Sequence, residues 1–222
     1  MLLSQTIIRF PEIRLQPRDA HKLRGYFGNI FREHSPLLHN HYETGELRYK
    51  YPLVQYKVLD RIPTLVAIEE GARLLTSLFL NIRELDIDGQ KFEVFSKNIE
   101  SRQVEAGFSD ELHQYNFRTL WMALNQDNFK RFLEESKTGR QQMLDKILVG
   151  NILSFFKGID LRLEKEQKLM AKVKVLEKST RFKEREMMAF EGSFVVNAFL
   201  PAYIGLGKGV SRGFGTISSD WK

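Results

Sequence analysis

Apolar and polar residues follow one another along the first half of the chain in patterns that predict strands and helices in turn. Period-two alternation predicts strands over residues 6–15, 51–59 and 64–68, and a long strand or hairpin over 91–105. Apolar residues at helical spacing predict one helix that begins near Asp19 and another over 70–82, and the polar stretch 34–49 is typical of a loop. The order of these elements, β-α-β-β-α-β, is that of the ferredoxin-like motif.

The second half of the chain follows the same logic with different element lengths. Its patterns predict a strand over 115–124, two helices over 127–135 and 139–157, and strands over 169–176, 181–190 and 193–200. No sequence repeat relates the halves, and Gly107, Ser109 and Asp110 cluster between them. We therefore expect an α+β protein of two modules, residues 1–110 and 111–222, with antiparallel sheets and helices on one face.

The C-terminal segment from 205 to 215 is rich in glycine and carries cations among the glycines. Its glycines and the polar residues between them are Gly205, Gly207, Lys208, Gly209, Ser211, Arg212, Gly213 and Gly215. Glycine accepts positive φ and lets another backbone come close, and successive amides of such a loop can bind an anion. The spacing is neither G-x-x-x-x-G-K-[ST] nor G-x-G-x-x-G. We therefore expect a loop that contacts phosphates in preference to a flexible surface turn.

Positive charge is concentrated towards the two ends of the chain. Of the net +6, residues 1–61 contribute +4 (10 basic against 6 acidic), residues 62–161 contribute −3 (12 against 15) and residues 162–222 contribute +5 (12 against 7). Period two places Lys172 and Lys174 on one face of a predicted strand, and Arg181 and Lys183 on one face of another. Such faces could bind the backbone of RNA, and a solvated sheet face explains the same pattern equally well.

Composition limits the chemistry that the chain can perform. The chain has no cysteine, so disulfides and thiolate metal sites are not available to it. Arg9, Glu12 and Arg14 interrupt the apolar stretch that a signal peptide requires, and no apolar run approaches the roughly 18 residues of a membrane span. These features favour a cytoplasmic protein.

Histidines gather near the N-terminus, where His39 and His41 flank Asn40 in the predicted polar loop. Loops on a rigid scaffold often carry binding and catalytic groups, and imidazole exchanges a proton near neutral pH. Two solvated loop histidines are one alternative, and a metal site that would need further ligands is another. No G-x-S-x-G or H-E-x-x-H motif is present.

With these residues in view, the chain resembles a known family. The run Gly205-Leu206-Gly207, then five residues, then Gly213-Phe214-Gly215 is similar to the glycine-rich signature of the repeat-associated mysterious proteins. Segments 20–25, 38–41, 51–57 and 190–194 resemble the sixth CRISPR-associated protein family, whose members are endoribonucleases that cut precursor CRISPR RNA within each repeat.

The resemblance implies two tandem ferredoxin-like (RRM-like) modules. It also implies a reaction without metal or cofactor, in which a ribose 2′-OH attacks the adjacent phosphate and leaves 2′,3′-cyclic phosphate and 5′-OH ends. It implies catalytic roles for His39 and His41, with Tyr26 and Lys50 as candidate helpers, and RNA contacts along the glycine-rich segment. The expected partner is CRISPR repeat RNA, with other CRISPR effector subunits as further candidates, and the expected state is a monomer or weak homodimer. The alternatives are a non-catalytic RNA-binding subunit of an effector complex and, in a third class, an enzyme that binds a small nucleotide.

Overall fold

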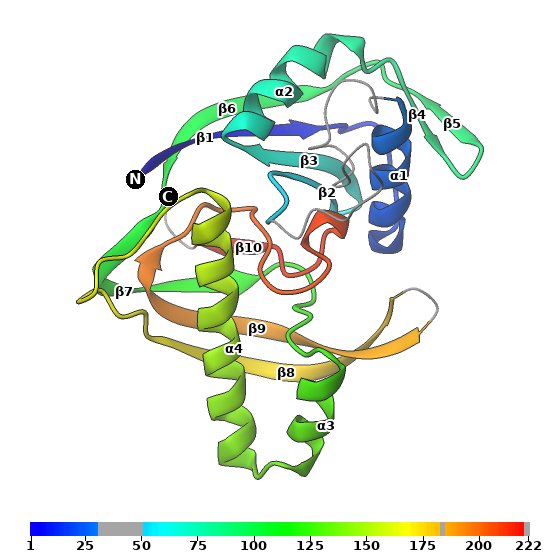
Figure 1. Ribbon diagram of the computed structural model, residues 1–222. Helices are drawn as coiled ribbons and strands as arrows, with labels where there is room; N and C mark the ends of the chain where they lie inside the picture. The colour runs from blue at the N-terminus through cyan, green and yellow to red at the C-terminus, as the bar shows by residue number, and fades with distance from the viewer. Residues whose placement is uncertain (31–50, 183–184, 220–222) are drawn as a thin grey trace, which may run out of the picture. The chain divides into compact units, whose positions relative to one another are not determined.

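The computed structural model describes residues 1–30, 51–182 and 185–219, which fall into two units by their contacts (Figure 1). The N-terminal module comprises residues 2–104 together with 211–213. The C-terminal module comprises Met1, residues 105–210 and those from 214 on. The glycine-rich segment therefore contributes residues to both modules.

The N-terminal module has the strand order of a ferredoxin-like fold. Its four-stranded sheet has the order β2-β3-β1-β6, and β4 and β5 form a separate hairpin between α2 and β6. The elements are β1 (Leu2–Arg9), η1 (Pro17–Asp19), α1 (Ala20–Ile30), β2 (Val54–Leu59), β3 (Ile62–Ile68), α2 (Glu70–Leu78), η3 (Phe79–Asn81), β4 (Glu84–Ile87), β5 (Gln90–Glu93) and β6 (Asn98–Glu105).

One face of this sheet packs against α1 and α2 and forms the core of the module. Phe27 of α1 lies between two core rings, with ring centroids 6.4 Å from Phe10 and 5.8 Å from Tyr56. Leu75 and Leu78 of α2 complete the same cluster. Aromatic side chains bury large apolar areas, so these contacts fix α1 and α2 on one face, as the sequence predicts.

The opposite face of the sheet, here called the polar face, carries charged and amide side chains beside the apolar Ile7 and Val66, and much of it is buried. Register pairs Arg9 of β1 and Lys57 of β2 with Thr64 of β3, so the three side chains share a face. Lys57 and Thr64 are buried, as are Gln5 and Gln55 on the same face. The alternation in β1 predicts one buried face, but this strand buries consecutive residues and so has both faces covered.

The C-terminal module repeats the strand order without a sequence repeat. Its sheet has the order β10-β7-β9-β8, which matches β6-β1-β3-β2 position by position. Helices α3 and α4 take the place of α1, and the glycine-rich segment lies between β9 and β10, where the first module has α2. The elements are β7 (Gly107–Phe117), α3 (Gln126–Glu134), α4 (Lys137–Gly158), β8 (Ala171–Phe182), β9 (Arg185–Phe199), η4 (Val210–Arg212) and β10 (Ile217–Ser219).

Local signals start both helices of this module within two residues of the positions that the sequence predicts. The side chain of Asn125 accepts a hydrogen bond from the amide of Asn128, and that of Ser136 accepts one from Gly139, so each caps the helix that follows. The α4 residues that are buried recur at helical spacing and are Leu144, Leu148, Ile152, Phe155 and Phe156. They pack α4 against the sheet, to which Gln141 also donates a hydrogen bond at Val173 O, 2.9 Å away.

Several predicted strand boundaries of the C-terminal module are wrong. The strand expected over 115–124 begins at Gly107 and ends at Phe117, so Gly107, Ser109 and Asp110 lie in a strand. The strand expected over 169–176 continues to Phe182, which places Arg181 on β8. The remainder of the strand expected over 181–190 and the strand expected over 193–200 form one strand, β9, which begins at Arg185 and runs through Gly192. A side chain at Gly192 would collide with the carbonyl of Lys174 on β8, so this glycine serves close strand pairing and does not break the strand.

In the N-terminal module, the sequence does not predict the hairpin of β4 and β5. Its turn is Asp88-Gly89, with φ of 59° and 80°, and the Gly89 amide donates to Asp86 Oδ1 at 2.8 Å. Asp-Gly is a common two-residue hairpin turn because both positions tolerate positive φ. The stretch 91–105 contains β5 and β6, and the strand expected over 6–15 ends at Arg9.

Candidate nucleic-acid interface

Close packing accounts for the glycines of the glycine-rich segment. A Cβ on Gly207 would lie 2.7 Å from Trp121 Nε1 and 2.8 Å from Met122 O, and one on Gly215 would collide with the carbonyl of Leu206. The φ angles at Gly207, Gly213 and Gly215 are +88°, +87° and +62°. The expectation that these glycines provide positive φ and close backbone approach is therefore confirmed.

Four amides of the segment donate to carbonyl oxygens of this chain. The amide of Leu206 donates to Gly215 O (2.9 Å), that of Gly215 to Leu120 O (2.9 Å), that of Lys208 to Met122 O (3.0 Å), and that of Phe214 to Gly209 O (3.4 Å). These four donors stabilise the fold and do not face a ligand. Of the cationic side chains of the segment, Lys208 is exposed and Arg212 half-buried.

The glycine-rich segment packs against residues 118–124, whose backbone lies outside the helices and strands of the sheet. Trp121 exchanges two backbone hydrogen bonds with Phe190 of β9, at 2.8 and 2.9 Å, and its indole Nε1 donates to Asn151 Oδ1 at 3.0 Å. Its ring stacks on Phe117, with centroids 5.1 Å apart. These contacts hold the residues after Phe117 in an irregular backbone conformation, and their apolar side chains pack in the core. Strand β7 therefore ends at Phe117.

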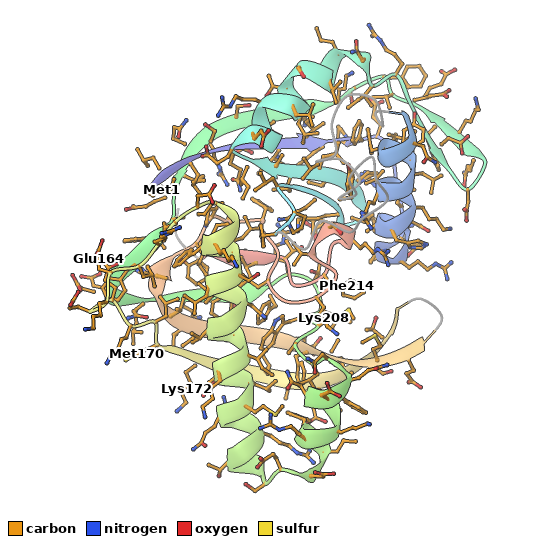
Figure 2. All side chains as sticks on the ribbon, in the orientation of Figure 1. Met1, Glu164, Met170, Lys172, Lys208 and Phe214 are labelled. Atoms are coloured by element: carbon orange, nitrogen blue, oxygen red, sulfur yellow. The ribbon has the colours of Figure 1, made fainter. Side chains whose placement is uncertain are left out.

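Lysines of β8 lie on the face of the strand that the sequence predicts. Lys172 and Lys174 are exposed, whereas Val173 between them is buried. Figure 2 shows the side chains of Lys172 on β8 and Lys208 on the glycine-rich segment at two separate places in the C-terminal module. Further along β8, Lys178 pairs with Glu191 at 2.9 Å, which partly neutralises that end of the strand.

Several predicted site residues lie wholly or partly outside the described part of the structure. His39, His41, Lys50 and Lys183 belong to the undescribed residues, and of Arg181 only the backbone register opposite Glu186 is described.

Tyr26 is described, and its hydroxyl donates to Glu84 O at 2.7 Å. Burial, followed by the charges of Glu84 and Asp86, raises the pKa of Tyr26. The hydroxyl is therefore a hydrogen-bond donor within the N-terminal module.

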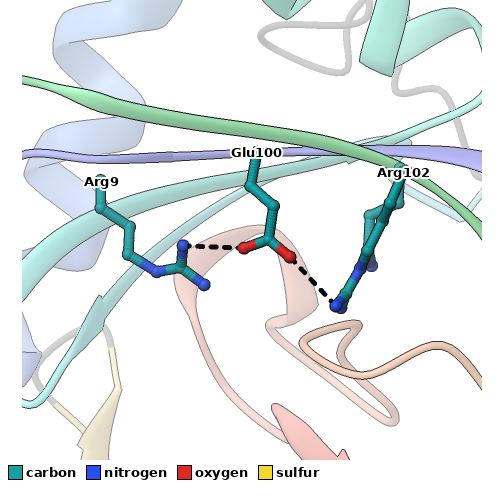
Figure 3. Close-up of polar contacts among 4 residues, drawn as sticks. Arg9, Glu100 and Arg102 are labelled. Carbon is teal, nitrogen blue, oxygen red and sulfur yellow. Dashed lines mark hydrogen bonds and ion pairs between the residues drawn. The ribbon is translucent and has the colours of Figure 1, made fainter.

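Sequence reasoning does not single out the cluster of Arg9, Glu100 and Arg102 (Figure 3). Glu100 accepts from Arg9 and from Arg102, each at 3.1 Å, and Arg102 also donates to Gln5 Oε1 at 2.9 and 3.0 Å. One carboxylate thus orients two guanidiniums and leaves a net positive charge on that face of the sheet. The only sequence signal is the period-two spacing of Glu100 and Arg102 in β6.

Lys57 is the most deeply buried cation on the polar face of the N-terminal sheet. Burial lowers its pKa to about 7. A lysine in this condition changes charge near neutral pH, which an exposed lysine does not do. Within the described ranges, no group of three or more His, Asp or Glu side chains is arranged to hold a metal ion, and no helix is long and apolar enough to cross a membrane.

Comparison with solved structures confirms the fold class. The CRISPR-Cas type IV Cas6 crRNA endonuclease Csf5 superposes with a TM-score of 0.62 at 12% identity, over all of both chains. At that identity the likeness concerns the fold alone. It agrees with the tandem ferredoxin-like architecture described above.

Closer relatives define the family. The Cas6b N-terminal domain model matches residues 1–105 and the Cas6b C-terminal domain model matches residues 107–219. A crystal structure of Cas6b is 35% identical with a TM-score of 0.92, and one of the CRISPR RNA processing endoribonuclease Cas6b is 33% identical with a TM-score of 0.79. Each comparison covers 99% of this chain and 100% of the other.

A curated relative adds a sequence match. The uncharacterized protein MJ0978 of Methanocaldococcus jannaschii is 36% identical over 141 residues, which are 63% of this chain and 95% of its own. The chain belongs to the Cas6b family, and the resemblance drawn from the glycine-rich signature is confirmed.

Proposed function

We propose that this protein is an endoribonuclease that processes precursor CRISPR RNA by cutting within its repeats. The observation that carries the proposal is the likeness over nearly the whole chain to a protein described as a CRISPR RNA processing endoribonuclease. The glycine-rich segment supports it, because its packed backbone presents Lys208 and Arg212 on a rigid support. A preorganised cationic surface is the general means of holding an RNA backbone.

The proposed reaction needs two proton transfers and no metal or cofactor. One imidazole of the pair His39 and His41 takes the proton of a ribose 2′-OH, and the 2′-oxygen attacks the adjacent phosphorus. The bond from phosphorus to the 5′-oxygen breaks, and the other histidine, as imidazolium, protonates that oxygen. The products carry a 2′,3′-cyclic phosphate and a 5′-OH, and each positioned proton transfer contributes about 10²–10⁴-fold to the rate.

The remaining predicted residues take supporting roles in this proposal. Lys50 stabilises charge on the phosphorane, and Tyr26 acts as a donor once its hydroxyl exchanges the Glu84 carbonyl for substrate. Side chains of the glycine-rich segment and the exposed Lys172 and Lys174 bind phosphates along the strand. Residues 1–110 would carry the nuclease residues, and residues 111–222 the glycine-rich contacts. The protein would be a cytoplasmic monomer or weak homodimer that could join other CRISPR effector subunits.

The test is incubation of the protein with repeat RNA from the CRISPR array of its own genome, in EDTA. We expect cleavage at one position in each repeat, with cyclic phosphate and 5′-OH ends identified by mass spectrometry. Replacing His39 and His41 together by alanine should abolish cleavage and leave affinity for the RNA near that of wild type. Binding without cleavage by the wild-type protein would instead indicate a non-catalytic RNA-binding subunit.

A further inference from the structure

Part of the glycine-rich segment packs against α1 and β2 within the N-terminal module. Residues 211–213 belong to this module by their contacts. A Cβ on Gly213 would lie 3.4 Å from the Cβ of Ala20 in α1 and 3.3 Å from the carbonyl oxygen of Tyr56 in β2. Because φ at Gly213 is +87°, a larger residue would also be strained there. Glycine at this position lets the chain lie directly on the first turn of α1.

One arginine lies on each of these packed elements. Arg24 lies one helical turn after Ala20 and hence on the same side of α1, and Arg212 directly precedes Gly213. Both side chains are half-buried. Burial lowers the pKa of Arg24 and the guanidinium of Arg212 lowers it further, while burial lowers the pKa of Arg212. The two guanidiniums thus lie near enough to repel one another in a partly dehydrated place, which favours a ligand that carries negative charge.

We propose that Arg24 and Arg212 together bind one phosphate of the RNA backbone. This inference rests on the proposed function, because that function makes RNA the ligand. A guanidinium presents a planar fork of N–H donors that matches two phosphate oxygens, so two forks from α1 and the glycine-rich segment hold one phosphodiester from two sides. Such a contact reads no base and fixes the position of the strand. Arg24 and Arg212 are therefore positioning residues.

The test removes the negative charge of one RNA phosphate at a time. Repeat RNAs that each carry a single methylphosphonate linkage are bound to the His39→Ala, His41→Ala protein, with and without the further changes Arg24→Gln and Arg212→Gln. We expect one linkage at which neutralisation weakens binding to the arginine-containing protein by about tenfold or more. At that linkage the arginine variant should show no further loss. Equal losses in both proteins at every linkage would overturn the proposal.

Arg73→Gln on α2 provides the matched control, because Arg73 is an exposed arginine of the same module. It should leave both the affinity and the methylphosphonate pattern unchanged. Thermal unfolding of each variant separates lost binding from lost folding, and Arg24→Lys, which keeps the charge but not the fork, should bind with intermediate affinity.

The inference and the proposed function fail in different ways. Repeat RNA that is cut and bound equally well by the Arg24→Gln, Arg212→Gln protein overturns the inference and leaves the endoribonuclease in place. Failure of the wild-type protein to bind repeat RNA overturns both.

Discussion

The two modules share a strand order and fill one position of it differently. In the N-terminal module, α2 follows β3 and buries Ala72, Leu75 and Leu78. In the C-terminal module the glycine-rich segment follows β9 instead. A helix satisfies its own backbone hydrogen bonds, so its side chains are free to pack. A segment without regular structure must find partners for its backbone elsewhere in the fold.

The glycine-rich segment finds those partners in residues 118–124 and in itself. The amides of Lys208 and Gly215 donate to the carbonyls of Met122 and Leu120. These hydrogen bonds bring the backbone of the glycine-rich segment close to that of residues 118–124. Gly207 and Gly215 therefore have no room for a Cβ. At this position the C-terminal module has no helix. It has instead a segment whose backbone is held by hydrogen bonds and whose Lys208 side chain is exposed. The comparison teaches that the same topological position can hold either a helix packed by its side chains or a segment fixed by its backbone.

Gly215→Ala should have the largest effect on stability. Its Cβ would collide with the Leu206 carbonyl, and φ of +62° is a strained angle for alanine. We expect the free energy of unfolding to fall by about 3 kcal/mol or more, measured by chemical denaturation.

Gly150→Ala is the matched control in the same module. Gly150 lies within α4, and a Cβ there would meet nothing within 4 Å. Alanine should stabilise this helix by up to about 1 kcal/mol. Similar losses in the two variants would mean that Gly215 has no special role in holding the segment.

The second prediction concerns the buried polar face of the N-terminal sheet. Because burial lowers the pKa of Lys57 from 10.5 to about 7 in the folded protein, the unfolded chain binds more protons between these two pH values. Stability should therefore rise as pH increases from about 7 to about 10.5, with a slope of up to about 1.4 kcal/mol per pH unit. Unfolding free energies measured across this range would show the slope.

Lys57→Met should remove this pH dependence and stabilise the protein at pH 7, since a neutral side chain of similar length avoids the cost of burying a charge. Lys91→Met, at an exposed lysine of β5, should leave the dependence unchanged. A flat profile in the wild-type protein would show that Lys57 stays charged when folded.

Much of the fold was predictable because regular elements leave a periodic trace in the sequence. The alternation of Lys172, Val173 and Lys174 predicts β8, and the helical spacing of Leu144 and Leu148 predicts α4. The apolar residues around Trp121 follow no periodic pattern that would indicate how they pack. Their burial beside the glycine-rich segment depends on hydrogen bonds between distant parts of the chain, so the sequence alone predicts them as the end of a strand.

The candidate site was predictable only where one segment carries its own signal. The glycine spacing indicates positive φ and close approach, but not that Trp121 and Met122 are the groups approached. The packing of Gly213 on Ala20 joins residues far apart in sequence, so no local pattern indicates that Arg24 and Arg212 act together. Such a pair can be recognised from contacts in the three-dimensional structure, and the spacing of residues along the sequence does not indicate it.

The smallest effect on stability is expected for the exposed lysines of the C-terminal sheet, in contrast to the buried Lys57 of the N-terminal sheet. Replacing Lys172 and Lys174 by alanine should change stability by less than about 0.5 kcal/mol, because both side chains are exposed. If each neutralises one RNA phosphate, the slope of log affinity against log salt should become shallower by about 0.7 per lysine.

Lys178→Ala on the same strand tests whether charge alone explains that effect. Lys178 pairs with Glu191 at 2.9 Å, so its charge is already partly neutralised and its loss should change the salt slope less. An equal change per lysine would mean that β8 attracts RNA only through its overall charge. A larger change per lysine at Lys172 and Lys174 would assign the contact to these two side chains, on a face that carries exposed lysines where the N-terminal sheet carries a buried one.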